Sequence, residues 1–305
     1  MIVYKKRESP EELQILDDLV HRSQADTKTL QHYRSLKSGY EGEMQFDRQI
    51  ANLDTEAYQL NDLLLKFNET HFQIDSLLIT QEKIYVYEIK NYQGEFLYQA
   101  DQFYKLPKRD VINPIHQLGR MIPLLTQLLR AHGFNLPIDA KIVFIHPEFT
   151  LFDAPMNTSM ILPTQLPHHL RMLNDLPSRL KSIHKRIADK LLELHIHDSP
   201  FKRVPRYSYE ELQKGVRCGG CGKISLSIIK KYYVCSNCSH KGLTEEAILD
   251  SINELLILFP DKKITTSLVG DWCSLSNTSV RGVLEKNFEK QGSNKGRYFI
   301  KREKS

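Results

Sequence analysis

The sequence predicts an α/β fold for the N-terminal half of the chain, followed by two small modules. Helix, two strands, helix and strand succeed one another between residues 37 and 150. Four of the five cysteines crowd into a short segment near residue 220, and helical patterns dominate after it. With 305 residues, of which 41% are hydrophobic, the chain is too long for one compact unit and can bury more than one core.

Apolar periodicity and turn residues predict the elements in order. A helix is expected within 9–36, and a second one from Gly39 towards a strand. Residues 72–79 and 83–90 read as two strands of a hairpin. Asn113-Pro114 begins a helix, 141–145 is a buried strand, and 163–200 is again helical. We therefore expect an N-terminal helical segment at 1–36, an α/β domain at 37–150, a helical segment and linker at 151–205, a cysteine-rich module at 214–241 and a helical module at 243–303.

Composition excludes several classes of protein. The mean hydropathy is −0.42, and no apolar run approaches the roughly 20 residues of a membrane span. The first ten residues are too charged for a secretion signal, and the cysteines suit a reducing compartment, so a cytoplasmic protein is expected. No glycine-rich phosphate loop or Gly-x-Ser-x-Gly elbow is present, which disfavours an NTPase or a serine hydrolase.

Charge is distributed unevenly along the chain. The formal net charge is +5, but residues 201–305 hold 19 Lys and Arg against 11 Asp and Glu. Such a basic C-terminal third indicates a polyanionic partner, although a solvated basic surface gives the same imbalance.

A carboxylate and lysine constellation marks the predicted hairpin. Glu88 and Lys90 are two residues apart on a strand, so they project from one face. If the strands pair, Asp75 approaches Glu88 closely enough for both to hold one divalent ion, and Glu43 adds a third acid. A bound metal activates water at a phosphodiester, and Lys90 would orient or help deprotonate that water. A solvated salt bridge also explains Glu-x-Lys, but an unpaired Asp75 in an apolar strand would be costly.

Four motifs occur in this order along the chain: Gly39-x-x-Gly42-Glu43, Gln73-Ile74-Asp75, Tyr87-Glu88-Ile89-Lys90-Asn91-Tyr92-x-Gly94 and Asn113-Pro114-x-x-Gln117. Together they resemble the nuclease-related domain (NERD) family, whose core is similar to that of the PD-(D/E)xK nucleases. The resemblance implies a nuclease-like mixed sheet flanked by helices, with Glu43, Asp75 and Glu88 as ligands of Mg²⁺ or Mn²⁺, Lys90 as the catalytic lysine and Gln117 as a residue that positions water or phosphate. Gln117 is equally explained as a polar residue on a helix surface. Ile74 stands where the nuclease superfamily often has proline, which weakens the case for catalysis more than that for the fold.

The cysteine segment predicts a zinc ribbon. Two Cys-x-x-Cys pairs are separated by 13 residues that are rich in strand formers. Four thiolates suit tetrahedral Zn²⁺ in a closed structural site, which would supply much of the folding free energy of so small a module. Reduced or redox-active cysteines are the alternative. The four predicted ligands are Cys218, Cys221, Cys235 and Cys238.

The last 60 residues resemble a winged helix-turn-helix domain. Three helical patterns, at 244–259, 265–273 and 276–288, precede a strand at 297–301. In such a domain the second helix of the turn enters the major groove of DNA. A three-helix interaction module with a basic, solvated surface is the alternative. The resemblance implies DNA contacts by Thr278, Ser279, Arg281 and Lys286 on that helix, and by Lys295 and Arg297 on the wing.

Together these observations predict a Mg²⁺-dependent DNA nuclease that hydrolyses phosphodiester bonds and that its C-terminal modules direct to DNA. The alternative is a non-catalytic DNA-binding or regulatory protein that retains the nuclease-like scaffold. RNA is not separable from DNA as the substrate, because the chemistry at the phosphodiester is shared. No membrane partner is expected, and the sequence does not indicate an oligomeric state.

Overall fold

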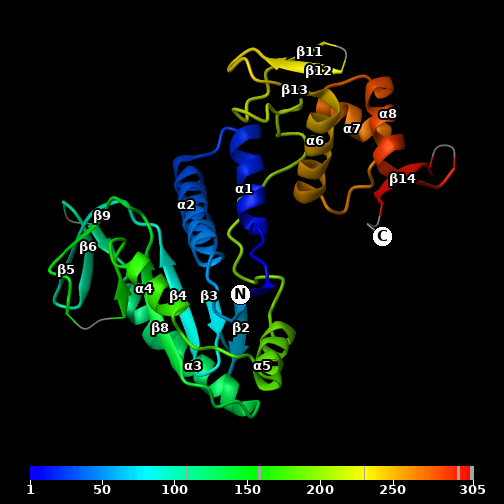
Figure 1. Cartoon of the computed structure of the whole chain (residues 1–305). Helices are drawn as coiled ribbons and strands as arrows, with labels where there is room; N and C mark the ends of the chain where they lie inside the picture. Colours follow the sequence, from blue (N-terminus) through cyan, green and yellow to red (C-terminus); the bar gives the residue numbers. More distant parts are fainter. Residues whose placement is uncertain (108, 157–158, 230, 294–295, 303–305) are drawn as a thin grey trace. The chain divides into compact units, whose positions relative to one another are not determined.

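The computed structural model describes residues 1–305 except 108, 157–158, 230, 294–295 and 303–305. The chain forms two compact units. The first unit contains residues 1–9 and 35–201, and the second contains 10–34 and 202–305. Helix α2 (Thr27–Ile50) passes from the second unit into the first (Figure 1). The chain therefore leaves the first unit after nine residues, returns to it within a helix and leaves it again at residue 202.

A six-stranded mixed sheet forms the centre of the first unit, which confirms the predicted fold class. Strands β2, β3 and β4 are antiparallel to one another, whereas β1 joins β2, β8 joins β4 and β10 joins β8 in parallel. The strands, in their order across the sheet, are β1 (Ile2–Lys5), β2 (Tyr58–Phe67), β3 (Thr70–Ile79), β4 (Ile84–Lys90), β8 (Ile138–Phe144) and β10 (Met160–Ile161).

Helices cover both faces of this sheet. Alternate residues of β4 enter two different cores, with Ile84 and Val86 in one and Tyr85 and Tyr87 in the other. The first core contains apolar residues of α3 (Pro114–Ala131) and α5 (Ser182–Glu193). The second contains residues of α2 and α4 (Leu166–Asn174). Because β4 is covered on both sides, the polar residues at its end lie in a largely buried setting.

A second, smaller sheet follows β4 in the chain. The sequence analysis did not predict it, because its strands are short and separated by a helix. In order across the sheet its strands are β7 (Arg109–Val111), β6 (Gln102–Lys105), β5 (Gly94–Gln99) and β9 (Phe149–Phe152). Gly94 opens β5 with φ of +98°, a left-handed conformation that favours glycine and explains its place in the third motif.

The second unit combines α1 (Glu11–Arg22) with the C-terminal third of the chain. Strands β11 (Leu226–Ile229), β12 (Tyr232–Cys235) and β13 (Lys241–Leu243) form a three-stranded antiparallel sheet. The helices are α6 (Thr244–Leu258), α7 (Thr266–Cys273) and α8 (Asn277–Asn287), and the hairpin strands are β14 (Phe288–Gln291) and β15 (Tyr298–Lys301). A single β-bridge joins Ile264 to Phe299.

A buried arginine ties α1 to this unit. The Arg22 side chain is fully buried, and its guanidinium forms an ion pair with Glu254 of α6 through Nε and Nη2, the Nε–Oε2 distance being 2.7 Å. Nη1 donates to the carbonyl oxygens of Gln213 and Gly215, and the guanidinium carbon lies 4.1 Å from the centroid of the Trp272 ring. Because every one of these partners belongs to the second unit, α1 is an integral part of its core.

Candidate active site and metal centre

The polar site of the first unit forms where β3 and β4 stop pairing through their backbones. Their antiparallel ladder runs from Ile79 opposite Ile84 to Ser76 opposite Tyr87. At the next position the Asp75 carboxylate accepts a hydrogen bond from the backbone N–H of Ile89, with Oδ2 2.7 Å from the nitrogen. A side chain of β3 thus satisfies an amide of β4, which places the Asp75 carboxylate at the edge of β4.

Glu88 and Lys90 lie together at the end of β4. Lys90 Nζ donates to Glu88 Oε1 over 2.6 Å, and the two side chains are only 12% (Glu88) and 15% (Lys90) exposed. Ile89 between them is buried in the core that contains α2. The strand pleat therefore sends the carboxylate and the ammonium to the same side, the arrangement that the period-two pattern predicts.

Helix α2 brings Glu43 to this site, and Gly42 permits its close approach. A Cβ atom at Gly42 would lie 2.5 Å from Cβ of Asn91, the residue that follows β4. The Asn91 side-chain amide also donates to the backbone carbonyl of Ser38, with 2.8 Å between the atoms. The second glycine of the first motif thus has a packing role, whereas a Cβ at Gly39 would meet nothing within 4 Å.

Arg7 is a residue of the candidate site that the sequence reasoning missed. Its side chain is 2% exposed, and Nη1 lies 2.6 Å from Glu43 Oε2. Nε and Nη2 form a fork on the Asp47 carboxylate at 2.8 and 3.2 Å, while Nη2 also donates to the backbone carbonyl of Asp75 over 2.7 Å. Asp47 follows Glu43 by one helical turn, which was an available signal. Nothing local distinguished Arg7 from the exposed charges beside it.

Burial and crowded charge shift the pKa values of these groups. Burial, reinforced by the carboxylates of Glu88 and Glu43, raises the pKa of Asp75 well above its usual range. Burial also raises the pKa of Glu43 to about 7, although the Arg7 guanidinium opposes that rise. Burial acts to lower the pKa of Lys90, but the Glu88 and Asp75 carboxylates outweigh it and the pKa of Lys90 is raised.

The chemistry of Glu43, Asp75 and Glu88 suits a hard divalent cation, but within the described residues the three carboxylates are not gathered closely enough to hold one as they stand. The three carboxylates offer oxygen ligands, and their mutual repulsion is what a divalent charge relieves. In this structure Glu43 is paired with Arg7 and Glu88 with Lys90. Among the described residues, a group of three or more His, Cys, Asp or Glu side chains gathered tightly enough to hold a metal occurs only at the four cysteines.

Gln117 does not take part in the hydrogen bonds that the described residues form at this site. It follows the start of α3, where the Asn113 side chain caps the helix by accepting the N–H of Ile115 over 2.9 Å. Asn113-Pro114 is therefore a helix-capping signal. Within the part of the chain that the structure describes, half-buried Gln117 makes no hydrogen bond to Asp75, Glu88 or Lys90.

The four cysteines of the second unit form a compact cluster. Their sulfur atoms all lie within 4.8 Å of one another. Cys218 Sγ is 3.7 Å from Cys238 Sγ, and Cys221 Sγ is 3.7 Å from Cys235 Sγ. Zn–S bonds of about 2.3 Å in a tetrahedron separate neighbouring sulfurs by about 3.8 Å, so the spacing and the thiolate chemistry both fit zinc. The cluster predicted from the Cys-x-x-Cys spacing is thus present and could bind Zn²⁺.

Comparison with known families identifies the domain in which the first site lies. Residues 38–145, which carry all four motifs, match the nuclease-related domain family. This chain contains a nuclease-related domain. The match confirms the resemblance seen in the sequence and places Glu43, Asp75, Glu88, Lys90 and Gln117 inside the nuclease-related domain. No curated protein and no solved structure shows significant similarity to the chain.

The predicted DNA-contacting residues lie outside the nuclease-related domain, on α8 and beyond it. Thr278, Ser279 and Arg281 are exposed, as is Arg297 before β15. Lys286 is exposed too, but its Nζ lies 2.8 Å from Glu245 of α6, which neutralises part of its charge. Lys295 lies outside the described residues.

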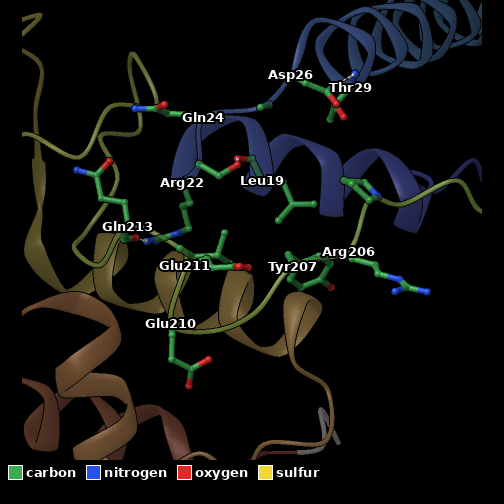
Figure 2. Close-up of a pocket in the computed structure, with 14 residues that line it drawn as sticks. Leu19, Arg22, Gln24, Asp26, Thr29, Arg206, Tyr207, Glu210, Glu211 and Gln213 are labelled. Atoms are coloured by element: carbon green, nitrogen blue, oxygen red, sulfur yellow. Dashed lines mark hydrogen bonds between the residues drawn. The ribbon is translucent and has the colours of Figure 1, made fainter.

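A cavity of about 850 Å³ also lies outside the nuclease-related domain, between α1, the start of α2 and residues 205–213 (Figure 2). Two of its charged groups are engaged already. Arg22 contacts Glu254 and backbone carbonyls, and the Asp26 carboxylate accepts the N–H of Thr29 over 2.6 Å. We therefore assign it no chemistry.

Across the described residues, no helix is long and apolar enough to cross a membrane.

Proposed function

We propose that the protein is a divalent-cation-dependent nuclease that hydrolyses phosphodiester bonds in DNA. The observation that carries this proposal is the convergence of Asp75, Glu88 and Lys90 at the end of β4, inside a nuclease-related domain. Asp75, held by a backbone amide, lies beside the Glu88 and Lys90 pair. Two carboxylates and an ammonium group so placed could bring a cation and a water to the same phosphate.

Each residue has a role in this proposal. Asp75 and Glu88, with Glu43, would hold Mg²⁺ or Mn²⁺, and Glu88 would then exchange its ion pair with Lys90 for the cation. A bound divalent ion activates water and offsets charge on the phosphate. Lys90, whose pKa is raised, would orient the attacking water as an ammonium group, and a solvent water would take up the proton as the water oxygen bonds to phosphorus. The bond from phosphorus to the leaving oxygen then breaks, and that oxygen takes up a proton. Gln117 would assist in positioning.

The second unit would deliver the nuclease-related domain to DNA. Zinc held by the four cysteines would stabilise the small three-stranded sheet as a zinc ribbon. Helices α6 to α8 with the β14–β15 hairpin have the element order of a winged helix, and the exposed side chains of Thr278, Ser279 and Arg281 support a DNA-facing α8. Arg297, and Lys295 by its sequence position, would belong to the wing.

The proposal is tested by cleavage of plasmid, linear duplex and single-stranded DNA with Mg²⁺, with Mn²⁺ and with EDTA. Wild-type protein should cut, and Lys90→Ala and Asp75→Asn should each lower the rate about 100-fold or more. Lys66→Ala, which removes an exposed lysine paired with Glu69, is the matched control and should keep full activity. Because EDTA also extracts zinc, activity must return when Mg²⁺ is added back together with zinc.

Intact DNA under every condition would overturn the proposal, as would cleavage by Lys90→Ala at the wild-type rate. If the intact DNA still shifts on a gel, the non-catalytic DNA-binding protein becomes the better description. Calorimetric titration with Mn²⁺ adds a measurement that does not depend on activity, because the heat of binding should disappear in Asp75→Asn.

A further inference from the structure

The outer face of the three-stranded cysteine sheet has an unusual composition. Directly opposite residues of antiparallel strands share a face, and the register places Tyr232 opposite Leu243 and Val234 opposite Lys241. Tyr232 is 50% exposed and Leu243 is 38% exposed, and Lys241 is exposed beside them. The outer face therefore presents an aromatic ring and a leucine to solvent, where a strand normally carries polar groups.

The inner face of the same sheet differs sharply. Tyr233 and Cys235, one residue along from the outer positions, are buried in the core of the second unit. Tyr233 and Cys235 thus pack into the core, whereas the side chains of Tyr232 and Leu243 lie outside it; Ile228, opposite Tyr233, is itself 38% exposed. A Tyr–Leu pair that contributes nothing to the core is a candidate binding surface.

Charge indicates what this surface binds. Residues 218–244 contain four lysines and no Asp or Glu. Those four positive charges exceed the net charge of about −2 on a zinc ion bound by four thiolates. Lys231 Nζ lies 5.3 Å from the centroid of the Tyr232 ring. Among the described residues, neither Lys231 nor Lys241 has an acidic partner within ion-pair distance.

We propose that the outer face of this sheet binds single-stranded nucleic acid by stacking a base on Tyr232, with Lys231 and Lys241 neutralising adjacent phosphates. A single strand offers a flat apolar base beside a phosphate, and it matches an exposed ring flanked by unpaired ammonium groups. A duplex keeps its base faces inside the stack and cannot use the ring. The inference rests on the proposed function, since it names the form of nucleic acid that the second unit engages.

Binding is measured by fluorescence anisotropy with a labelled 20-nucleotide single strand of thymidine, the corresponding RNA strand and a matching duplex. The protein is the full zinc-loaded chain carrying Lys90→Ala, so that the probe stays intact. Tyr232→Ala should weaken single-strand binding about 5- to 100-fold, whereas Tyr232→Phe should bind like the parent. Lys231→Gln with Lys241→Gln should reduce the dependence of log Kd on log salt by about 0.7 for each phosphate that the protein no longer neutralises.

Phe152→Ala is the matched control, because Phe152 is a similarly exposed aromatic residue on a strand of the first unit. Zinc content shows that each variant keeps its cluster. The inference would be overturned if Tyr232→Ala bound the single strand as tightly as its parent does. It would also be overturned if Tyr232→Ala weakened the binding of duplex and of single strand by the same factor. Full competition of an acidic peptide with the single strand would overturn it too. Absence of cleavage in the earlier assay leaves this measurement unaffected, so the two proposals fail separately.

Discussion

Replacing Arg7 by leucine should destabilise the first unit by about 3 to 5 kcal/mol at about pH 8, because it leaves buried carboxylates without their cation. The Arg7 guanidinium is 2% exposed and contacts Glu43, Asp47 and the carbonyl of Asp75. Leucine keeps much of the apolar volume but supplies no donor. Arg7→Lys should lose less stability than Arg7→Leu, because the ammonium group keeps the positive charge. It should still lose some, because an ammonium group cannot span the same three acceptors.

The size of this effect should depend on pH through Glu43. Burial raises the pKa of Glu43 from 4.5 to about 7, although Arg7 opposes the rise, so the folded state binds a proton more tightly than the unfolded state does. The corresponding stability is fully present below about pH 4.5 and is lost as pH rises through about 7. With Arg7 present, this rise in the pKa of Glu43 already lowers the free energy of unfolding by roughly 3 kcal/mol at high pH. Without Arg7 the pKa of Glu43 should rise further, so the variant should lose more at about pH 8 than at about pH 5.5.

Hydrogen exchange of β3 amides measures this loss in the first unit. The single tryptophan of the chain, Trp272, lies in the second unit, so its fluorescence during denaturation serves as an internal control. A loss below about 1 kcal/mol, or the same loss at both pH values, would refute the reasoning. A shift of the tryptophan transition equal to the loss in β3 would show that the substitution acts on the whole chain rather than on the acid cluster.

Three further predictions concern Gly42, Arg22 and the four cysteines. Gly42→Ala should cost about 1 to 3 kcal/mol in β3 exchange, because its Cβ would lie 2.5 Å from Asn91, whereas Gly39→Ala should be neutral or stabilising by up to about 1 kcal/mol; equal effects would contradict this. Arg22→Leu should destabilise the second unit by about 3 to 5 kcal/mol, measured by tryptophan fluorescence, and an unchanged midpoint would contradict it. Native mass spectrometry should find one zinc ion per chain, released when any one of the four cysteines becomes serine, and zinc retention in such a variant would exclude the tetrathiolate.

Local periodicity was enough to predict the centre of the candidate site. The hairpin was readable because 83–90 alternates and is separated from 72–79 by a turn, and that pairing brings Asp75 to β4. Strand β2 was not predicted as a strand because Tyr58–Phe67 is buried on both sides and therefore does not alternate. Helix α2 begins at Thr27 rather than Gly39, since its glycines read as a break although one of them is a packing position inside the helix.

Buried charges account for what local patterns could not predict. Arg7 and Arg22 sit in charged stretches that look solvated, yet each is buried against acids far along the chain, Glu43 in one case and Glu254 in the other. A buried guanidinium is stable only where several acceptors converge on it, and that convergence exists only after the sheet or the helix pair has formed. The same contacts determine which unit each element belongs to. Arg22 binds α1 to the core of the second unit, whereas Arg7 binds the segment after β1 to the acids of the first unit. A helix that passes between the units is the consequence, and no change in composition at residue 34 could have signalled it.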